Sequence, residues 1–363
     1  MKNNILIITG GTGGHVIPAL NFFNYLKNQN KNNKIFFLTD YRGFEYLKDF
    51  NKKEVLKIKS SHLSGNIFFK LVAIIKLLIG FLQSVLIFIK YRPKIIISFG
   101  SYASFTPLLC FIFFKFIFNT RLYIHEQNSI IGQTNKFFLK FAKRIFVNFD
   151  KKYNSIKKFE HKISIVGLPQ RFSRNYFYNT AINKDKFIFL IFAGSQGSLD
   201  IIDIFVKILE PIKKITISKK IKFYIQCPYQ KQKEIENLLS KYNFDFEIKS
   251  FFNNFQNILK ITNLAICRSG AGTIDDLINF KIPAIISPLP SAKDNHQYEN
   301  AKILSDIDCG IIINKNNMDI DKIILFISKV INDKNFNKSL LSNYSKIIRH
   351  NSSELIWKII NDD

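Results

Sequence analysis

Residues 5–19 read ILIITGGTGGHVIPA, and a second stretch of the same kind, FIFLIFAGSQGS, covers residues 187–198. Each begins with an apolar run rich in β-branched or aromatic residues, as expected of a buried strand, and continues into a glycine-rich turn. A strand that leads through glycines into a helix is the opening unit of a doubly wound α/β domain. Because this pattern starts twice, the sequence predicts two Rossmann-like domains.

Further apolar runs alternate with longer helical stretches after each of these starts. In the first half we expect helical segments to begin near Val16, Gly43, Asn66, Phe105, Gly132 and Lys151. Apart from Ile5–Thr9 and Phe187–Phe192, strands are predicted at Lys34–Thr39, Ile95–Ser98, Leu122–His125, Arg144–Val147, Ile163–Val166, Lys222–Gln226, Phe244–Lys249, Leu264–Cys267, Ala284–Ser287 and Gly310–Ile313. Strands separated by helices form parallel sheets that are covered on both faces.

The domain boundary is expected where apolar periodicity weakens, in Gly167–Asn179. We therefore expect an N-terminal domain at 1–167 and a C-terminal domain at 168–344. The tail, Ser339–Ile360, has the pattern of helices, and we expect the last of them, at about 345–363, to pack back on the N-terminal domain.

Length and composition agree with two globular domains. The chain has 363 residues, of which 47% are hydrophobic and 22% are charged, so an intrinsically disordered protein is excluded. Its cysteines, Cys110, Cys227, Cys267 and Cys309, form no C-x-x-C pair. A disulfide framework and a cysteine-based zinc site are therefore not expected.

The formal net charge is +26, and it is unevenly distributed along the chain. Up to Gly167 there are 26 basic and 7 acidic residues, and from Leu168 onward there are 27 and 20. A basic surface attracts nucleic acid, anionic lipid or an anionic substrate. The alternative is a compositional drift towards lysine without functional meaning.

Leu71–Ile89 is a stretch of 19 residues whose only charged residue is Lys76. Hydropathy alone makes it a candidate transmembrane helix. However, the apolar runs Ile95–Ser98 and Leu122–His125 that follow it have the pattern of buried strands of a soluble sheet. We therefore favour a core or interfacial helix, for which the flanking lysines suit a contact with anionic lipid.

The first glycine loop, Gly10–His15, joins a predicted strand to a predicted helix. Glycines allow close approach of a ligand to the backbone, and a helix N-terminus offers free N–H groups to an anion. The dinucleotide fingerprint G-x-G-x-x-G fails because Val16 stands at the third glycine position, and the lysine of a P-loop is missing. His15 is a candidate general base because imidazole accepts a proton near neutral pH, although a structural histidine is the alternative.

Other polar loops also follow predicted strands. They read SFGSYAS at 98–104, HEQN at 125–128, AGSQGS at 193–198, RSGAGT at 268–273 and PLPSAKDNHQYEN at 288–300. Ligands of open parallel sheets bind at the carboxyl ends of the strands, so these loops indicate ligand-binding edges. Helix N-termini with Ser, Thr and Gly suit phosphate oxygens, and Asp275 or Asp276 could accept hydrogen bonds from a ribose, although helix capping explains such residues equally well.

As a set, GGTGGH at 10–15, HEQN at 125–128, GSQGS at 194–198, RSGAGT at 268–273 and DNHQYENA at 294–301 resemble the MurG family of peptidoglycan glycosyltransferases. The resemblance implies a GT-B fold, in which two Rossmann-like, doubly wound domains face one cleft. It implies inverting transfer of N-acetylglucosamine from UDP-N-acetylglucosamine to the C4 hydroxyl of MurNAc in lipid I, giving lipid II and UDP. It also implies a peripheral location at the cytoplasmic face of the inner membrane, an anionic membrane surface and the cell-wall synthesis machinery as partners, and no nucleic acid.

The resemblance also implies roles for single residues. His15 is the implied general base. Implied donor-binding residues are Thr12, Gly13, Gly14, Asn128, Arg171, Ser195, Gln196, Phe252, Ser269, Gly270, Thr273, Asp276 and Gln297. Implied acceptor-binding residues are Gly14, His15, Gly100, Ser101 and Tyr102.

Neither a cofactor nor a metal is expected in this scheme, because helix N-termini would stabilise the charge on the leaving UDP. Two Asp-x-Asp pairs, Asp306/Asp308 and Asp319/Asp321, lie late in the chain and are interpreted as solvated charges.

Some positions depart from the family pattern. Asp276 stands where the family usually has the longer glutamate that binds ribose, and Ser101 and Phe105 stand where it usually has glycine. Leu168 precedes Pro169 where the family often has asparagine.

Three alternatives remain at the level of the sequence. The chain could be another two-domain UDP-sugar enzyme, such as a 2-epimerase or a different GT-B transferase. It could be a non-catalytic binder of membranes or nucleic acid, although it carries no RNA-binding signature. It could also be a transferase fold that has lost its activity through the altered glycine loop.

Overall fold

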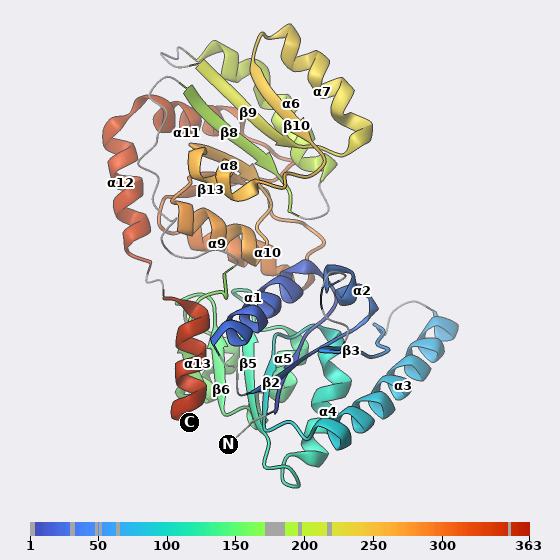
Figure 1. Ribbon diagram of the computed structural model, residues 1–363. Coiled ribbons are helices and arrows are strands. Elements are labelled where there is room, and N and C mark those ends of the chain that lie inside the picture. The colour runs from blue at the N-terminus through green and yellow to red at the C-terminus, as the bar shows by residue number, and fades with distance from the viewer. Residues whose placement is uncertain are drawn as a thin grey trace. The chain divides into compact units, whose positions relative to one another are not determined.

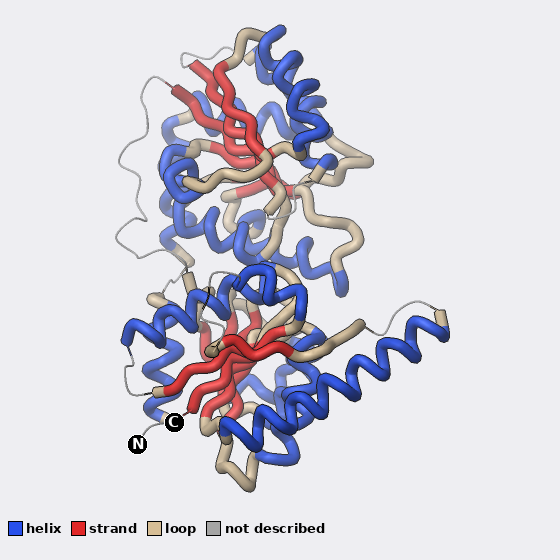
Figure 2. Tube along the Cα trace, turned by 45° about the vertical axis from the view of Figure 1, so that its right-hand side comes forward, coloured by secondary structure: helices blue, strands red, loops and turns tan. Residues whose placement is uncertain are grey.

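A computed structural model describes residues 4–29, 33–47, 50, 53–62, 66–170, 186–194, 198–215, 220–347 and 350–363. The chain divides into two compact units, which we call the N-terminal unit (1–173 and 349–363) and the C-terminal unit (174–348). In each unit helices cover both faces of a parallel sheet (Figures 1 and 2). The prediction of two doubly wound α/β domains is thereby confirmed.

The described part of the N-terminal unit contains a seven-stranded sheet in the order β3-β2-β1-β4-β5-β6-β7. Its strands are β1 (Asn4–Ile8), β2 (Lys34–Thr39), β3 (Val55–Lys57), β4 (Ile95–Ser98), β5 (Arg121–Glu126), β6 (Arg144–Val147) and β7 (Ile163–Ile165). Its helices are α1 (Gly13–Gln29), α2 (Tyr41–Phe44), α3 (Ile67–Tyr91), α4 (Phe105–Phe114), α5 (Gln133–Phe138) and α13 (Ser352–Asp362). The chain reverses its direction across the sheet between β1 and β4, where Ile5 pairs with Ile95 and Ile8 with Ser98.

Strand β1 supplies apolar side chains to both faces of this sheet, which explains its unbroken hydrophobic sequence. Ile5 and Ile7 belong to a core with α1, and Leu6 and Ile8 belong to a second core with α3, α4 and α5. The C-terminal helix α13 adds Ile356 to the first of these cores, and Figure 1 shows it beside α1.

The described part of the C-terminal unit contains a six-stranded sheet in the order β10-β9-β8-β11-β12-β13. Its strands are β8 (Lys186–Phe192), β9 (Lys220–Gln226), β10 (Asp245–Lys249), β11 (Leu264–Cys267), β12 (Ala284–Ile286) and β13 (Gly310–Ile312). Its helices are α6 (Leu199–Lys214), α7 (Tyr229–Lys241), α8 (Phe255–Ile261), α9 (Ala271–Phe280), α10 (His296–Ser305), α11 (Ile320–Asn332) and α12 (Lys334–Ser345). The reversal lies between β8 and β11, so this sheet repeats the arrangement of the first one.

Two elements differ from the expectations. The edge strand β3 was not predicted, because three residues are too few to show a period in the sequence. The helix expected near Lys151 is a 3₁₀ helix at Asn154–Lys162. The helices predicted in the tail are confirmed as α12 and α13, whereas most of the predicted linker lies outside the described residues.

Helix α3 is long and apolar enough to cross a membrane by the criteria of length and composition. Asn66 begins it by accepting a hydrogen bond from the Phe69 N–H at 3.1 Å, and Arg92, in the left-handed conformation before Pro93, ends it. Only a narrow side packs on the protein, and Gly80 lies there because a Cβ would come within 2.0 Å of the Lys59 carbonyl oxygen.

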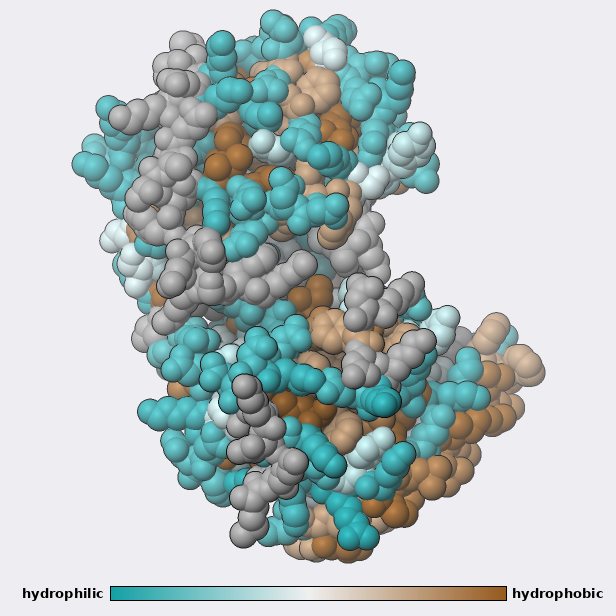
Figure 3. Space-filling model, in the orientation of Figure 1, coloured by the Kyte–Doolittle hydropathy of each residue, from teal (hydrophilic) through white to brown (hydrophobic). Residues whose placement is uncertain are grey.

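The opposite side of α3 is exposed and apolar, so of the two predicted alternatives, a core helix and an interfacial helix, this side does not fit the core helix. Phe113, near the end of α4, packs its ring on that of Phe81 in α3, with 6.1 Å between the ring centroids. The exposed apolar surface therefore extends from α3 onto the end of α4. We define the α3 surface as the exposed residues Ile67, Phe68, Phe69, Leu71, Ile74, Ile75, Leu78, Leu82, Leu86, Ile89, Phe113, Phe116 and Ile117. Figure 3 shows hydrophobic residues gathered along this helix.

Candidate active site

Strands β1, β4 and β5 are neighbours in the N-terminal sheet, so the loops that follow them meet at one edge. Gly10 shows how closely two of these loops approach. A Cβ at this position would lie 2.5 Å from the Cβ of Ala103 and 2.8 Å from Oδ1 of Asp40, which leaves space for glycine only.

His15 lies in the first turn of α1 and is half-buried at this junction. Its Nδ1 is 3.0 Å from the carbonyl oxygen of Phe99, which follows β4. The same nitrogen is 2.8 Å from Oε1 of Gln127, which follows β5. The imidazole is therefore held by residues from the other two loops, which brings together three motifs that lie far apart in the sequence.

The HEQN loop is held by hydrogen bonds that converge on the Glu126 carboxylate. The buried Glu126 carboxylate accepts hydrogen bonds from the N–H groups of Asn128 at 3.1 Å and Gly132 at 2.9 Å, and from Nδ2 of Asn135 at 2.9 Å. Nδ2 of Asn128 also lies 3.3 Å from this carboxylate. Glu126 thus holds the half-buried Asn128, the implied donor-binding residue, in a defined position.

His125 is fully buried in this loop, and burial lowers its pKa to about 4. Its Nε2 is 2.9 Å from the carbonyl oxygen of Gly167, and its ring stacks on Phe99 with 5.0 Å between centroids. At neutral pH His125 is therefore uncharged and serves the loop as a hydrogen-bonding group.

Two residues beside the first and second glycine loops, Asp40 and Arg42, were not predicted from the sequence. Oδ1 of Asp40 accepts hydrogen bonds from the N–H groups of Gly11 and Gly43, both at 2.9 Å. The Tyr102 hydroxyl donates to Oδ2 of Asp40 at 3.2 Å, and Arg42 donates to this hydroxyl and lies over the ring of Tyr102. The signal was available, because Asp40 directly follows the strand β2.

Burial and the Asp40 carboxylate raise the pKa of Tyr102, so its hydroxyl keeps its proton. The side chain of Arg42 is 56% exposed, which leaves its guanidinium accessible beside the first and second glycine loops. These loops therefore combine accessible backbone with a fixed positive charge, as an anionic ligand requires.

Ser101 has φ 78° and ψ 153°, a backbone conformation that essentially only glycine adopts without strain. We therefore expect Ser101→Gly to raise the free energy of unfolding of the N-terminal unit by about 1 kcal/mol, since relief of strain exceeds the extra entropy of an unfolded glycine. Chemical denaturation of the wild type and the variant measures this difference.

The matched control is Ser101→Ala, which removes the same hydroxyl and keeps the Cβ. It should not stabilise the protein. Equal stability of the glycine and alanine variants would contradict the assignment of strain to this residue.

In the C-terminal unit the loops after β8, β11 and β12 are neighbours in the same way. Ser269 and Gly270 lie directly before α9, and Thr273 lies in its first turn. The carbonyl oxygen of Ser269 accepts a hydrogen bond from Nδ2 of the buried Asn300 at 3.0 Å, whereas its buried Oγ has no partner among the described residues. Asp276 lies one turn further into α9 and is half-buried.

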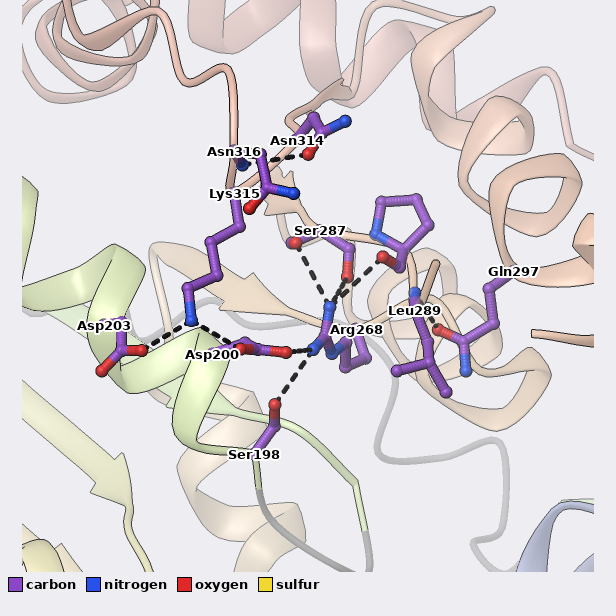
Figure 4. Close-up of polar contacts among 11 residues, drawn as sticks. Ser198, Asp200, Asp203, Arg268, Ser287, Leu289, Gln297, Asn314, Lys315 and Asn316 are labelled. Atoms are coloured by element: carbon purple, nitrogen blue, oxygen red, sulfur yellow. Dashed lines mark hydrogen bonds and ion pairs between the residues drawn. The ribbon is translucent and has the colours of Figure 1, made fainter. Parts of the chain in front are cut away.

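Arg268 is the central polar residue of this unit, and it too was missed, although it precedes the predicted Ser269. Its buried guanidinium donates to the carbonyl oxygens of Ser287 at 3.0 Å and Pro288 at 3.2 Å. It also donates to Oγ of Ser198 at 3.1 Å and to Oδ2 of Asp200 at 2.6 Å (Figure 4). A single side chain thus joins the ends of β11 and β12 to the start of α6.

Lys315 completes this network from the loop after β13. Its Nζ donates to Asp200 at 2.6 Å and to Asp203 at 2.7 Å, as Figure 4 shows. The hydrogen bond from Lys315, together with that from Arg268, lowers the pKa of Asp200 against the opposing effect of burial. Asp200 therefore stays ionised and holds both cations.

The remaining predicted residues lie in different surroundings. Thr12 and Gly14 are exposed beside His15, and Oε1 of Gln297 accepts the N–H of Leu289 at 2.9 Å. The ring of Phe252 is buried against Tyr224, which leaves its main chain as the part that a ligand could contact.

Arg171, Ser195 and Gln196 lie outside the described residues, so their predicted roles stay predictions.

Gly13 is buried at the start of α1. Asp319 caps α11 by accepting the Lys322 N–H at 3.0 Å. In the part of the chain that the structure describes, no cluster of three potential metal ligands occurs.

Comparison with known proteins identifies both units. Residues 5–147 match the glycosyltransferase family 28 N-terminal domain, and residues 188–354 match the glycosyltransferase family 28 C-terminal domain. A relative from Rickettsia canadensis is 34% identical over 345 residues, which cover 92% of this chain and 94% of the relative. A relative from Rickettsia typhi is 31% identical over 350 residues and 88% of each chain.

Both relatives are named UDP-N-acetylglucosamine–N-acetylmuramyl-(pentapeptide) pyrophosphoryl-undecaprenol N-acetylglucosamine transferase. Among solved structures, Acinetobacter baumannii MurG matches the fold with a TM-score of 0.77 and 20% identity, over 99% of this chain and all of that one. Both motifs and relatives extend over the two units, and the chain therefore belongs to the MurG family of glycosyltransferases.

Proposed function

We propose that this protein transfers N-acetylglucosamine from UDP-N-acetylglucosamine to the C4 hydroxyl of MurNAc in lipid I, with inversion at the sugar C1. The observation that carries the reaction class is His15, held at a glycine-loop junction by groups from two further loops. The substrates come from the names of relatives that align over about nine-tenths of the chain. Lipid II and UDP are the products, and the reaction belongs to peptidoglycan biosynthesis.

His15 is the proposed general base. Inverting transfer is a direct displacement in which the acceptor hydroxyl loses its proton as it attacks the sugar C1. An imidazole at this point would accept that proton, and proton transfer of this kind contributes typically about 10²–10⁴-fold to a rate. Asn128, held by Glu126, is the proposed contact to the donor sugar.

The donor is proposed to bind the C-terminal unit. The N-terminus of α9, with Ser269, Gly270 and Thr273, suits the diphosphate, because free N–H groups and the helix dipole favour negative charge. The same groups would stabilise the charge that develops on the leaving UDP. Asp276 is the proposed ribose ligand, and the main chain at Phe252 is the proposed uracil contact.

Further donor contacts are proposed on the pattern of the motifs. They are Thr12, Gly13, Gly14, Arg171, Ser195, Gln196 and Gln297.

The acceptor diphosphate is proposed to bind at the two glycine loops of the N-terminal unit, through Gly14 and Gly100–Tyr102. The exposed guanidinium of Arg42 adds a positive charge at the same edge. Asp40 positions this group of loops through its hydrogen bonds to Gly11, Gly43 and Tyr102.

The α3 surface is the proposed contact with the anionic cytoplasmic face of the membrane, where a lipid-linked acceptor resides. Exposed apolar patches of this size are unusual on monomeric soluble proteins and mark interaction sites. Exposed Lys70, Lys76 and Lys90 border the surface and complement an anionic leaflet. Only 22% of the 18-residue apolar window in α3 is buried. Packing of α3 against the rest of the protein accounts for this buried part of the window.

Replacing Leu78 and Leu82, which are 60% and 62% exposed, with serine is expected to weaken binding to vesicles. The loss of two apolar side chains from the interface corresponds to about 3 kcal/mol, or roughly 100-fold. Co-sedimentation with vesicles that contain phosphatidylglycerol measures the effect, and added salt should weaken the wild-type binding because lysines contribute.

The matched control is Leu325→Ser/Leu341→Ser, which removes two exposed leucines from the C-terminal unit. It should bind vesicles as the wild type does. An equal loss in both double variants would point to general hydrophobicity and contradict a dedicated surface.

The proposed reaction is tested by incubating the protein with UDP-N-acetylglucosamine and lipid I and measuring lipid II. Formation of lipid II supports the proposal. Conversion of UDP-N-acetylglucosamine to its 2-epimer without acceptor would indicate the epimerase alternative, and absence of both products would indicate a transferase fold without activity.

A further inference from the structure

A continuous chain of polar groups runs through the N-terminal unit from the carbonyl oxygen of Phe99, through His15, to the carbonyl oxygen of Gly167. Nδ1 of His15 is 2.8 Å from Oε1 of Gln127, and Nε2 of Gln127 is 3.2 Å from Nδ1 of His125. Nε2 of His125 is in turn 2.9 Å from the carbonyl oxygen of Gly167. The middle of this chain is buried, since His125 and Gln127 are at most 1% exposed.

Both ends of the chain are backbone carbonyl oxygens, and a carbonyl oxygen only accepts hydrogen bonds. At one end Phe99 O lies 3.0 Å from Nδ1 of His15, a contact that favours a proton on this nitrogen. At the other end Gly167 O requires a proton on Nε2 of His125. The two carbonyl oxygens thus favour one ring proton each, and the glutamine between the rings has to match both of them.

The orientation of the Gln127 amide then follows. Nδ1–H of His15 needs an acceptor, which is Oε1, and the unprotonated Nδ1 of neutral His125 needs a donor, which is Nε2. The low pKa of the buried His125 agrees with its neutral form. The opposite orientation of the amide would place donor against donor at His15 and acceptor against acceptor at His125.

We propose that Gln127 and His125 are positioning residues that hold His15 in the tautomer with its proton on Nδ1, so that the lone pair of Nε2 is free to accept the proton of the acceptor hydroxyl. This inference rests on the proposed base role of His15. In water a histidine side chain favours the opposite tautomer, with the proton on Nε2, in which that nitrogen could not act as a base. Among the residues that the structure describes, none forms a hydrogen bond to Nε2 of His15.

The surrounding loop keeps this arrangement rigid. Nδ2 of Asn148 donates to the main-chain oxygen of Gln127 at 3.0 Å, and Phe99 stacks on the ring of His125. Gln127 Nε2 also lies 3.2 Å from the His125 carbonyl oxygen, which restrains the amide from a second side. Because these groups are buried, rotation of the amide would leave several polar atoms without partners.

The wild-type protein provides the first test and needs no substitution. The chain has six histidines, so ¹⁵N-histidine labelling gives few signals, and those of His15 are identified by their loss in His15→Gln. Long-range ¹H–¹⁵N correlation distinguishes the two neutral tautomers. We expect His15 protonated on Nδ1 and His125 protonated on Nε2, and a wild-type His15 protonated on Nε2 would overturn the inference.

Gln127→Leu tests whether the glutamine is required. It removes the amide at similar size, and we expect a mixture of His15 tautomers and a kcat that is lower by about tenfold or more. The Kd for UDP should change by less than twofold, because UDP lacks the sugar that Asn128 is proposed to contact and its diphosphate is proposed to bind the C-terminal unit. An unchanged His15 tautomer in this variant would overturn the role of Gln127 and leave Phe99 O as the sufficient partner.

Asn135→Ala is the matched control. Asn135 donates to the His125 carbonyl oxygen at 3.2 Å and touches the same loop without belonging to the chain of polar groups, so its loss should leave the tautomer as in the wild type. A tautomer change in Asn135→Ala as large as in Gln127→Leu would show a general loop effect and contradict the inference.

The two proposals fail in different ways. The tautomers are read without substrate, so a protein with the expected tautomers that makes no lipid II would contradict the proposed function alone. A protein that makes lipid II with His15 protonated on Nε2 would contradict the positioning role alone.

Discussion

The His15→Ala variant is expected to lose about 10²–10⁴-fold in kcat for transfer from UDP-N-acetylglucosamine to lipid I. The imidazole is the proposed proton acceptor, and alanine leaves the acceptor hydroxyl with water as its base. The structure supports so large an effect because the ring is anchored by Phe99 O and Gln127 and is therefore ready for proton transfer without reorganisation.

Steady-state kinetics measures kcat, and calorimetry measures the Kd for UDP. This Kd should remain within about twofold of the wild-type value, because kcat and donor affinity depend on different groups. The matched control is His161→Ala, an exposed histidine on the 3₁₀ helix Asn154–Lys162, and it should have wild-type turnover. Unchanged turnover of His15→Ala would show that His15 is structural.

The Arg268→Met variant is expected to weaken donor binding and to destabilise the C-terminal unit by about 2–3 kcal/mol. Methionine preserves much of the volume, but it leaves the carbonyl oxygens of Ser287 and Pro288 without their charged donor. The estimate lies below that for a fully buried ion pair, because the side chain of Asp200 is 41% exposed and keeps its bond to Lys315.

Donor binding should suffer because Arg268 joins three loops whose backbone is proposed to surround the nucleotide. We expect KM for UDP-N-acetylglucosamine to rise by about tenfold or more, with a smaller change in kcat, since misplaced N–H groups cost about 1.5 kcal/mol or more of binding. Arg268→Lys should recover only a part of both losses, because an ammonium group can bind Asp200 but cannot span the carbonyl oxygens as a guanidinium does.

Hydrogen exchange gives the stability of each unit within the full chain. In Arg268→Met, exchange should accelerate in β11 and β12 and stay unchanged in β1 and β4. The matched control is Arg144→Met, which removes an arginine–aspartate pair with Asp363 in the N-terminal unit. It should leave KM for the donor unchanged, and an equal rise of KM in both variants would contradict the role of Arg268.

Much of the fold could be predicted from local patterns. Ile5–Thr9 and Phe187–Phe192 can be recognised as strands, because a strand buried on both faces needs an unbroken apolar run. Strand β1 is an example, since its side chains enter a hydrophobic core on each face of the sheet. The glycine turns after them could be predicted for the same local reason. The edge strand Val55–Lys57 could not be predicted, because its composition does not mark it as a strand. Its pairing with β2 makes it one.

The candidate site was predictable only as a set of separate loops. His15 and HEQN could be named as polar residues at strand ends, but Asp40, Arg268 and Lys315 were missed. Their importance lies in the distant groups that they join, such as Asp200 with Arg268 and Lys315, and no local pattern reveals such partners.

The sequence by itself therefore determined the α/β class, the doubling of the domain, the motif loops and the family, because periodicity, glycine turns and motif order are properties of neighbouring residues. Only the tertiary structure decided that the loops after β1, β4 and β5 meet, that Nδ1 of His15 lies between Phe99 O and Gln127, and that one side of α3 stays exposed. The physical reason is that strand order brings distant residues within hydrogen-bonding distance, and that the exposure of a helix face depends on whether another element packs against it.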